Sequence, residues 1–124
     1  MKALVVDDSM MMRSLVSKLL ARLSFVVVEA RDGKQAVEAI EANAGAFDVI
    51  LLDWNMPVMN GYDALVHMMQ SPALGKAKVI MLTTENQLDN IRRALEAGAA
   101  EYVMKPFTEE MLIEKVKMVT DGPL

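Results

Sequence analysis

Residues 47–61 read FDVILLDWNMPVMNG, and this stretch decides how the rest of the chain is arranged. The apolar run at residues 49–52 is rich in branched side chains, which predicts a short strand buried on both faces. Pro57 lacks an N–H and restricts the residue before it, so no regular element continues far beyond Asp53. The Asn-Gly pair that ends the stretch indicates a turn before a helix. Asp53 is therefore expected at the carboxyl end of a central strand, where open α/β sheets bind ligands.

Strand and helix patterns alternate on both sides of this stretch. Short apolar runs predict four further strands at residues 3–6, 25–28, 78–83 and 102–104. Apolar stripes at helical spacing predict five helices, with caps at Ser9, Asp32 and Thr108, a stop at Gly98 and an irregular end at residues 120–124. Such alternation predicts a doubly wound α/β fold with a five-stranded parallel sheet of flavodoxin-like order 2-1-3-4-5.

Composition narrows the function classes. The 124 residues are enough for one domain, expected to span residues 1–124, and 53% hydrophobic with 24% charged residues is an ordinary globular balance. A net charge of −4 disfavours a nucleic-acid-binding surface spread over the fold. The absence of cysteine excludes disulfides and thiolate metal sites. Two early aspartates disfavour a signal peptide, and no apolar run approaches the roughly 20 residues of a membrane span. We expect a cytoplasmic protein that does not bind membranes.

Three carboxylates are expected to meet at one edge of the sheet. Asp7 and Asp8 follow the first strand and Asp53 follows the third, and these strands are neighbours in the expected order. Like charges this close raise each other's pKa unless a cation joins them. Mg²⁺ takes oxygen ligands and accepts a few carboxylates, so the sequence predicts a magnesium site.

Two further polar groups are expected at the same edge. The fourth strand ends in Thr83 and Thr84, which offer hydroxyl donors, and the fifth ends in Lys105, which offers an ammonium group. Carboxylates, a metal, a hydroxyl and a lysine around one cleft indicate a phosphoryl-transfer site. Asp53 is the candidate nucleophile for an acyl phosphate, because the acidic pair after the first strand is needed to hold the metal.

Two other classes share parts of this pattern. A flavodoxin-type electron carrier has the same expected topology, but the Asp7-Asp8 pair would repel a flavin phosphate. A hydrolase of the haloacid dehalogenase type uses an aspartyl nucleophile after its first strand, but there the spacing is Asp-x-Asp and a cap domain is usual. The one histidine, His67, lies off the apolar stripe of its expected helix and is interpreted as a surface residue.

The chain resembles response-regulator receiver domains, and among them the single-domain chemotaxis regulators. The resemblance covers essentially the whole chain and is carried by VVDDS at residues 5–9, LLDWNMP at 51–57, the strand ending in Thr83, and AGAAEYVMKPF at 97–107. It implies that Asp53 receives phosphate from a phosphohistidine on a CheA-like histidine kinase. It also implies that Asp8, Asp53 and the backbone carbonyl of Asn55 bind Mg²⁺ with help from Asp7. Thr83 and Lys105 would contact the phosphoryl oxygens, and the Lys105–Pro106 bond would be cis.

The resemblance further implies a switch. Tyr102 would turn inward when Thr83 moves toward the phosphoryl group, and the face made by the fourth helix, fifth strand and fifth helix would change for a partner. That partner would be a flagellar motor switch protein or another effector, although Leu88 stands on this face where a basic residue is common. Such a protein is a monomeric signalling phosphoacceptor rather than a dedicated enzyme, and a phosphatase can act on it.

The lifetime of the phosphorylated state is expected to depend on two loop residues. Asn55 lies two residues past Asp53 and Glu85 lies two past Thr83, and both can hold a water near the line of attack. In the family this combination accompanies rapid self-dephosphorylation. The alternative within the family is the receiver domain of another phosphorelay or of a longer response regulator.

Overall fold

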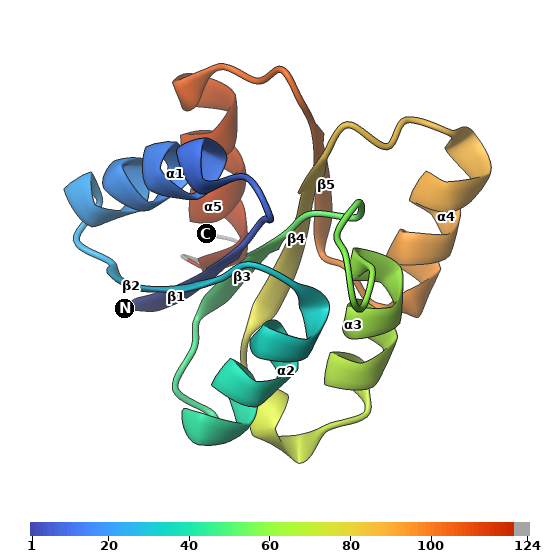
Figure 1. Cartoon of the computed structure of the whole chain (residues 1–124). Coiled ribbons are helices and arrows are strands. Elements are labelled where there is room, and N and C mark those ends of the chain that lie inside the picture. The colour runs from blue at the N-terminus through green and yellow to red at the C-terminus, as the bar shows by residue number, and fades with distance from the viewer. Residues whose placement is uncertain (121–124) are drawn as a thin grey trace.

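The computed structural model describes residues 1–120 and contains a five-stranded parallel sheet in the order β2-β1-β3-β4-β5, which confirms the expected fold class (Figure 1). The strands are β1 (Lys2–Val6), β2 (Val26–Ala30), β3 (Val49–Leu52), β4 (Lys78–Thr83) and β5 (Glu101–Met104). From β1, the strand order extends to β2 on one side and to β3, β4 and β5 on the other, so the boundary between β1 and β3 is the switch point at which ligands bind in such sheets.

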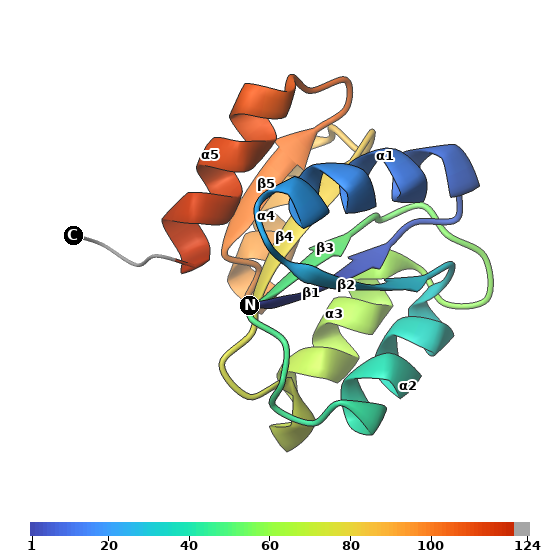
Figure 2. The same cartoon turned by 90° about the vertical axis from the view of Figure 1, so that its left-hand side faces the viewer.

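Helices cover both faces of the sheet. They are α1 (Met10–Arg22), α2 (Gly33–Ala42), α3 (Gly61–Met69), α4 (Leu88–Ala97) and α5 (Glu109–Thr120), with a short 3₁₀ helix η1 (Pro72–Leu74) after α3. Helices α1 and α5 lie on one face, whereas α2, α3 and α4 lie on the other (Figures 1 and 2). Within residues 1–120, no helix is both long enough and apolar enough to cross a membrane.

The sheet separates two apolar layers, and alternate residues of each central strand enter opposite layers. In β3, Ile50 and Leu52 pack toward α2, α3 and α4, while Val49 and Leu51 pack toward α1 and α5. All four β3 residues are buried, as the unbroken apolar run predicts. This burial fixes the level at which β3 ends and therefore the position of Asp53.

The predicted helix caps are confirmed. The side chains of Ser9 and Asp32 accept hydrogen bonds from backbone N–H groups in the first turns of α1 and α2, and Thr108 does the same for α5. Gly98 ends α4 with a φ of 123°, a conformation that favours glycine.

One glycine brings a helix close to the site. A Cβ on Gly61 would lie 1.9 Å from the carbonyl oxygen of Asp53, so only glycine allows α3 to begin so near the end of β3.

Several element boundaries differ from expectation. Strands β1 and β5 begin at Lys2 and Glu101, each one residue before the expected start. Strand β2 begins at Val26 and continues to Ala30, because its register with β1 extends to the pair of Val6 and Ala30, while the N–H of Phe25 donates instead to Leu20. Helix α5 includes Thr120, whose hydroxyl donates to the carbonyl of Val116. The rest of the expected irregular end, residues 121–124, lies outside the described residues.

Candidate functional site

Four strands deliver polar side chains to one edge of the sheet. Asp7 follows β1, Asp53 follows β3, Thr83 ends β4 and Lys105 follows β5. Asp7 and Asp53 are only 4% and 5% exposed and Thr83 is fully buried, whereas Asp8 is exposed. The expected convergence of these residues is therefore present, because all strands of a parallel sheet end on the same side.

The three aspartates form a set of oxygen donors suited to a hard divalent cation. One carboxylate oxygen each from Asp7, Asp8 and Asp53 lie within 4.8 Å of one another. Oδ1 of Asp7 accepts a hydrogen bond of 2.9 Å from the N–H of Ser9, which fixes the orientation of this carboxylate. Hard oxygen donors at this spacing fit Mg²⁺, which binds through a few carboxylates and keeps several waters.

Lys105 lies between two of these carboxylates. Its Nζ is 2.6 Å from Oδ2 of Asp7 and 3.6 Å from Oδ2 of Asp53. The backbone N–H of Lys105 donates to the carbonyl of Thr83, so the end of β4 helps to fix where the lysine starts. The Lys105–Pro106 bond is cis, as the resemblance implies. The ammonium group is thus within reach of any anionic group bound to Asp53.

Burial raises the pKa of Asp53, and the negative charge of Asp7 raises it further. Three neighbouring groups lower the pKa of Asp53 but do not cancel the effect of burial: the Thr83 hydroxyl, the Lys105 ammonium and the Asn55 N–H. The charged form of Asp53 is therefore only partly compensated by its protein neighbours. An additional cation bound by Asp7, Asp8 and Asp53, here called the acidic cluster, would favour the ionised form of Asp53. The ionised form is the one that can act as a nucleophile.

A chain of hydrogen bonds joins the end of β4 to β5. The N–H of Glu85 donates to Oγ1 of Thr83 at 3.2 Å, and the hydroxyl of Tyr102 donates to the carbonyl of Glu85 at 2.7 Å. Burial, with the charges of Glu85 and Asp53, raises the pKa of Tyr102 to about 12, so its hydroxyl stays protonated and able to donate. Because Thr83 Oγ1 accepts this bond, its own O–H remains able to donate to another oxygen.

The two residues expected to influence dephosphorylation lie in the loops after β3 and β4. Asn55 is exposed, and its N–H donates to Oδ1 of Asp53 at 3.4 Å. One carboxylate oxygen of Glu85 accepts from the N–H of Gln87 at 3.0 Å, which holds this side chain against its own loop.

Two supporting groups at the site were not predicted from the sequence. Arg13 donates from Nη1 to the carbonyl of Asp7 at 2.8 Å and pairs through Nε with Glu29 at 3.3 Å, which ties α1 to the end of β1. Its position one turn after Ser9 was the available signal, since residues four apart share a helix face. Tyr62 stacks on Trp54 beside the site, and no apolar periodicity indicates such a contact.

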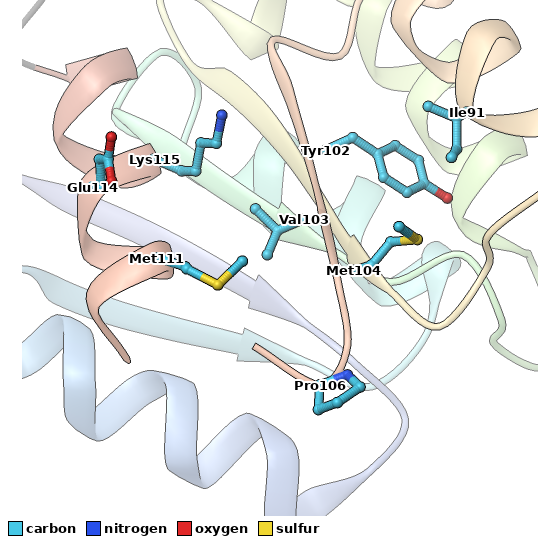
Figure 3. Close-up of a pocket in the computed structure, with 8 residues that line it drawn as sticks. All are labelled: Ile91, Tyr102, Val103, Met104, Pro106, Met111, Glu114 and Lys115. Carbon is cyan, nitrogen blue, oxygen red and sulfur yellow. The ribbon is translucent and has the colours of Figure 1, made fainter. Parts of the chain in front are cut away.

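A cavity of about 490 Å³ lies on the face that the sequence analysis associates with a partner (Figure 3). Figure 3 shows the ring of Tyr102 beside Ile91 of α4, with Val103 facing Met111 of α5. The lining residues are Ile91, Tyr102, Val103, Met104, Pro106, Met111, Glu114 and Lys115. Leu88, at 67% exposed, lies outside this lining, and His67 is exposed as expected.

The chain is similar to known proteins in both sequence and structure. The model of the response regulator receiver domain matches residues 3–117. Chemotaxis protein CheY1 of Helicobacter pylori is 42% identical over 120 residues, which covers 96% of each chain. The structure of chemotaxis protein CheY4 of Vibrio cholerae matches with a TM-score of 0.84 and 35% identity over 95% of this chain and 97% of that one. A receiver domain of a Pseudomonas aeruginosa sensor histidine kinase, with a magnesium ion coordinated in its active-site cleft, matches with a TM-score of 0.85 and 27% identity over 98% of each chain.

Proposed function

The chain belongs to the response regulator receiver domain family, and from this premise we propose that it is a CheY-type phosphoacceptor of chemotaxis. In this proposal Asp53 takes a phosphoryl group from the phosphohistidine of a CheA-like histidine kinase in a Mg²⁺-dependent reaction. The observation that carries the proposal is the convergence of a buried Asp53, two further aspartates and Lys105 at one edge of the sheet. The names of the relatives from Helicobacter pylori and Vibrio cholerae support chemotaxis as the setting.

The residues have distinct roles in the transfer. A carboxylate oxygen of Asp53 attacks phosphorus, the new O–P bond replaces the N–P bond of the phosphohistidine, and the imidazole leaves with the bonding electrons. Lys105 and the hydroxyl of Thr83 bind the phosphoryl oxygens as they transfer. Asp8, Asp53 and the carbonyl of Asn55, with Asp7, would hold Mg²⁺, which neutralises charge on the transferring group.

The output face is the second part of the proposal. The cavity between α4, β5 and α5 offers apolar side chains with Glu114 and Lys115 at one side, a surface suited to a partner with an apolar anchor. Movement of Thr83 toward the phosphoryl group would lengthen the bond that its Oγ1 accepts from Glu85 and shift Tyr102, which lines this cavity. The partner would be a flagellar motor switch protein or another effector, and a phosphatase would shorten the signal.

The remaining expectations are parts of the same proposal. Residues 1–124 form one receiver domain, and the protein acts as a cytoplasmic monomer that catalyses only its own phosphorylation and dephosphorylation. A receiver domain in another phosphorelay is the second candidate. Two observations favour it: the likeness to the receiver domain of a sensor histidine kinase and the exposed, apolar Leu88 on α4. The acidic edge does not favour a flavodoxin-type carrier, because it would repel a flavin phosphate.

Phosphoryl uptake from acetyl phosphate tests the proposal, with intact-protein mass as the readout. We expect one added phosphoryl group in the presence of Mg²⁺ and little without it. Asp8→Asn should slow the uptake by at least about tenfold, because it removes a charged metal ligand. Asp63→Asn, on the exposed side of α3, is the matched control and should behave as wild type. Uptake that is equally fast with and without Mg²⁺, or equally fast in Asp8→Asn, would refute the metal-assisted reaction.

A further inference from the structure

Three side chains from three different elements stack beside the acidic cluster. The rings of Trp54, in the loop after β3, and Tyr62, in the first turn of α3, are stacked with centroids 5.3 Å apart and planes 25° from parallel. The guanidinium carbon of Arg93, on α4, lies 4.4 Å from the centroid of the Tyr62 ring. This is the geometry of a cation–π contact, so the three residues form a continuous stack from the loop after β3 to α4.

The loop end of this stack is adjacent in sequence to the site. Trp54 stands between Asp53 and Asn55, the residues proposed to bind Mg²⁺ through a carboxylate and a backbone carbonyl. The carbonyl of Trp54 accepts a hydrogen bond of 2.8 Å from the N–H of Gly61, which closes the loop onto α3. The Trp54 backbone is therefore tied both to the site residues on either side of it and to the start of α3, the helix that carries Tyr62.

The other end of the stack lies on a helix with few other anchors. Ala94 is the one buried residue of α4, and the cap residue Gln87 makes no hydrogen bond through its side chain. Helix α4 also forms one wall of the partner cavity through Ile91. The contact between Arg93 and Tyr62 is therefore one of the side-chain contacts that join α4 to α3.

We propose that Arg93 is a positioning residue that couples α4 to the metal site through Tyr62 and Trp54. The proposal rests on the proposed function and adds a second connection between Asp53 and the output face, separate from the one through Thr83, Glu85 and Tyr102. Because coupling between two sites is reciprocal, loss of the Arg93 contact should alter Mg²⁺ binding, and Mg²⁺ or phosphoryl binding should alter the placement of α4.

Trp54 is the one tryptophan of the chain, so all tryptophan fluorescence comes from this member of the stack. We expect Arg93→Ala to shift the Trp54 emission and increase its quenching by acrylamide in metal-free protein. The same variant should weaken Mg²⁺ binding by about two- to fivefold, which corresponds to the free energy of an exposed cation–π contact. The amide shift of Asn55 in a Mg²⁺ titration measures this affinity. Arg93→Lys keeps a cation above the ring and should restore part of both signals.

Arg92→Ala is the matched control. Arg92 is the preceding residue of the same helix, and it pairs with Asp89 at 3.9 Å on the exposed surface. This variant should leave the Trp54 emission and the Mg²⁺ affinity at their wild-type values. Wild-type values in Arg93→Ala, or equal changes in Arg92→Ala and Arg93→Ala, would overturn the proposal.

A double-mutant cycle separates the stack from a general loss of stability. Tyr62→Leu should reproduce the changes of Arg93→Ala, and the double variant should add little, because either substitution interrupts the same stack. Full additivity of the two Mg²⁺ effects would contradict the coupling. If wild-type protein showed no response to Mg²⁺, the proposed function would fail, and the emission of the metal-free variants would still decide whether Arg93 positions Trp54.

Discussion

Asp53 is nearly inaccessible at the end of β3, and burial raises its pKa although Thr83 and Lys105 lie nearby. Such an environment disfavours an isolated carboxylate but suits one that forms an acyl phosphate, provided that cations neutralise the added charge. The free-energy cost of ionising Asp53 thus follows directly from its burial in this site.

Replacing Asp53 by Asn should stabilise the fold near neutral pH. The folded pKa lies above the unfolded one, so the folded state binds the proton more tightly, and stability falls as pH rises from the unfolded pKa through the folded pKa. Asp53→Asn removes this loss, so its free energy of unfolding in urea should exceed the wild-type value at about pH 7, with a smaller difference near pH 3. Asp63→Asn, an exposed control, should change stability by less than about 0.5 kcal/mol. A less stable Asp53→Asn at neutral pH would contradict the role assigned to burial.

Asn55 and Glu85 should set how fast the acyl phosphate is hydrolysed. Both can orient a water for attack on phosphorus, and Glu85 is held in its loop by the N–H of Gln87. We expect the double variant Asn55→Lys, Glu85→Arg to lengthen the lifetime of the phosphorylated state by roughly tenfold or more, as measured by the decay of the labelled protein. Asn86→Lys, an exposed neighbour in the same loop, is the control for added charge. Equal decay rates in the double variant and wild type would show that neither residue orients water.

At the scale of elements, the site combines a rigid strand with a loosely held helix. All residues of β3 are buried, whereas α4 buries only Ala94. The loop between β4 and α4 contains Glu85, whose N–H donates to Thr83 Oγ1 and whose carbonyl accepts from the hydroxyl of Tyr102. A local change at Thr83 can therefore be passed to α4 and β5 while the strand that holds Asp53 stays in place.

Thr83→Ala should separate phosphorylation from its output. Asp53 and the acidic cluster remain in this variant, so phosphoryl uptake should continue, at a rate reduced by the loss of one donor to the phosphoryl group. The amide shifts of Leu88, Tyr102 and Lys115 on phosphorylation should be much smaller than in wild type, because the bonded chain through Glu85 loses its first member.

Thr84→Ala is the matched control for this experiment. Thr84 is the next residue and is exposed, so the variant should respond as wild type. Unchanged amide shifts on phosphorylation of Thr83→Ala would rule out coupling through Thr83 and leave the stack of Trp54, Tyr62 and Arg93 as the remaining connection to α4.

At the scale of the whole molecule, the sequence was sufficient for the topology and for the convergence of the site. Period and length of the apolar runs define β3 and β4, and a parallel sheet then places Asp7, Asp53 and Lys105 at the same edge without any knowledge of side-chain contacts. The roles of the Asn55 carbonyl in metal binding and of Tyr102 in the switch came from the resemblance to a family, because nothing in their spacing indicates them.

Other features depended on three-dimensional packing. The bonds from Arg13 to Asp7 and the stack of Tyr62 between Trp54 and Arg93 join elements whose relative orientation is not encoded in periodicity. The length of β2 likewise follows from its register with β1 rather than from its own residues. These contacts depend on rotamers and on the crossing of helices over the sheet, which a pattern of apolar residues does not determine.

The position of the phosphoryl group is the most direct test of Asp53 as the phosphoacceptor. Protein treated with acetyl phosphate and Mg²⁺ can be reduced with borohydride, which converts the aspartyl phosphate to homoserine, and the modified residue can then be located by peptide mass spectrometry. We predict modification at Asp53 in wild type and in Asp63→Asn, and none in Asp53→Asn. Modification at Asp7 or Asp8 in wild type, or undiminished labelling of Asp53→Asn, would contradict the assignment.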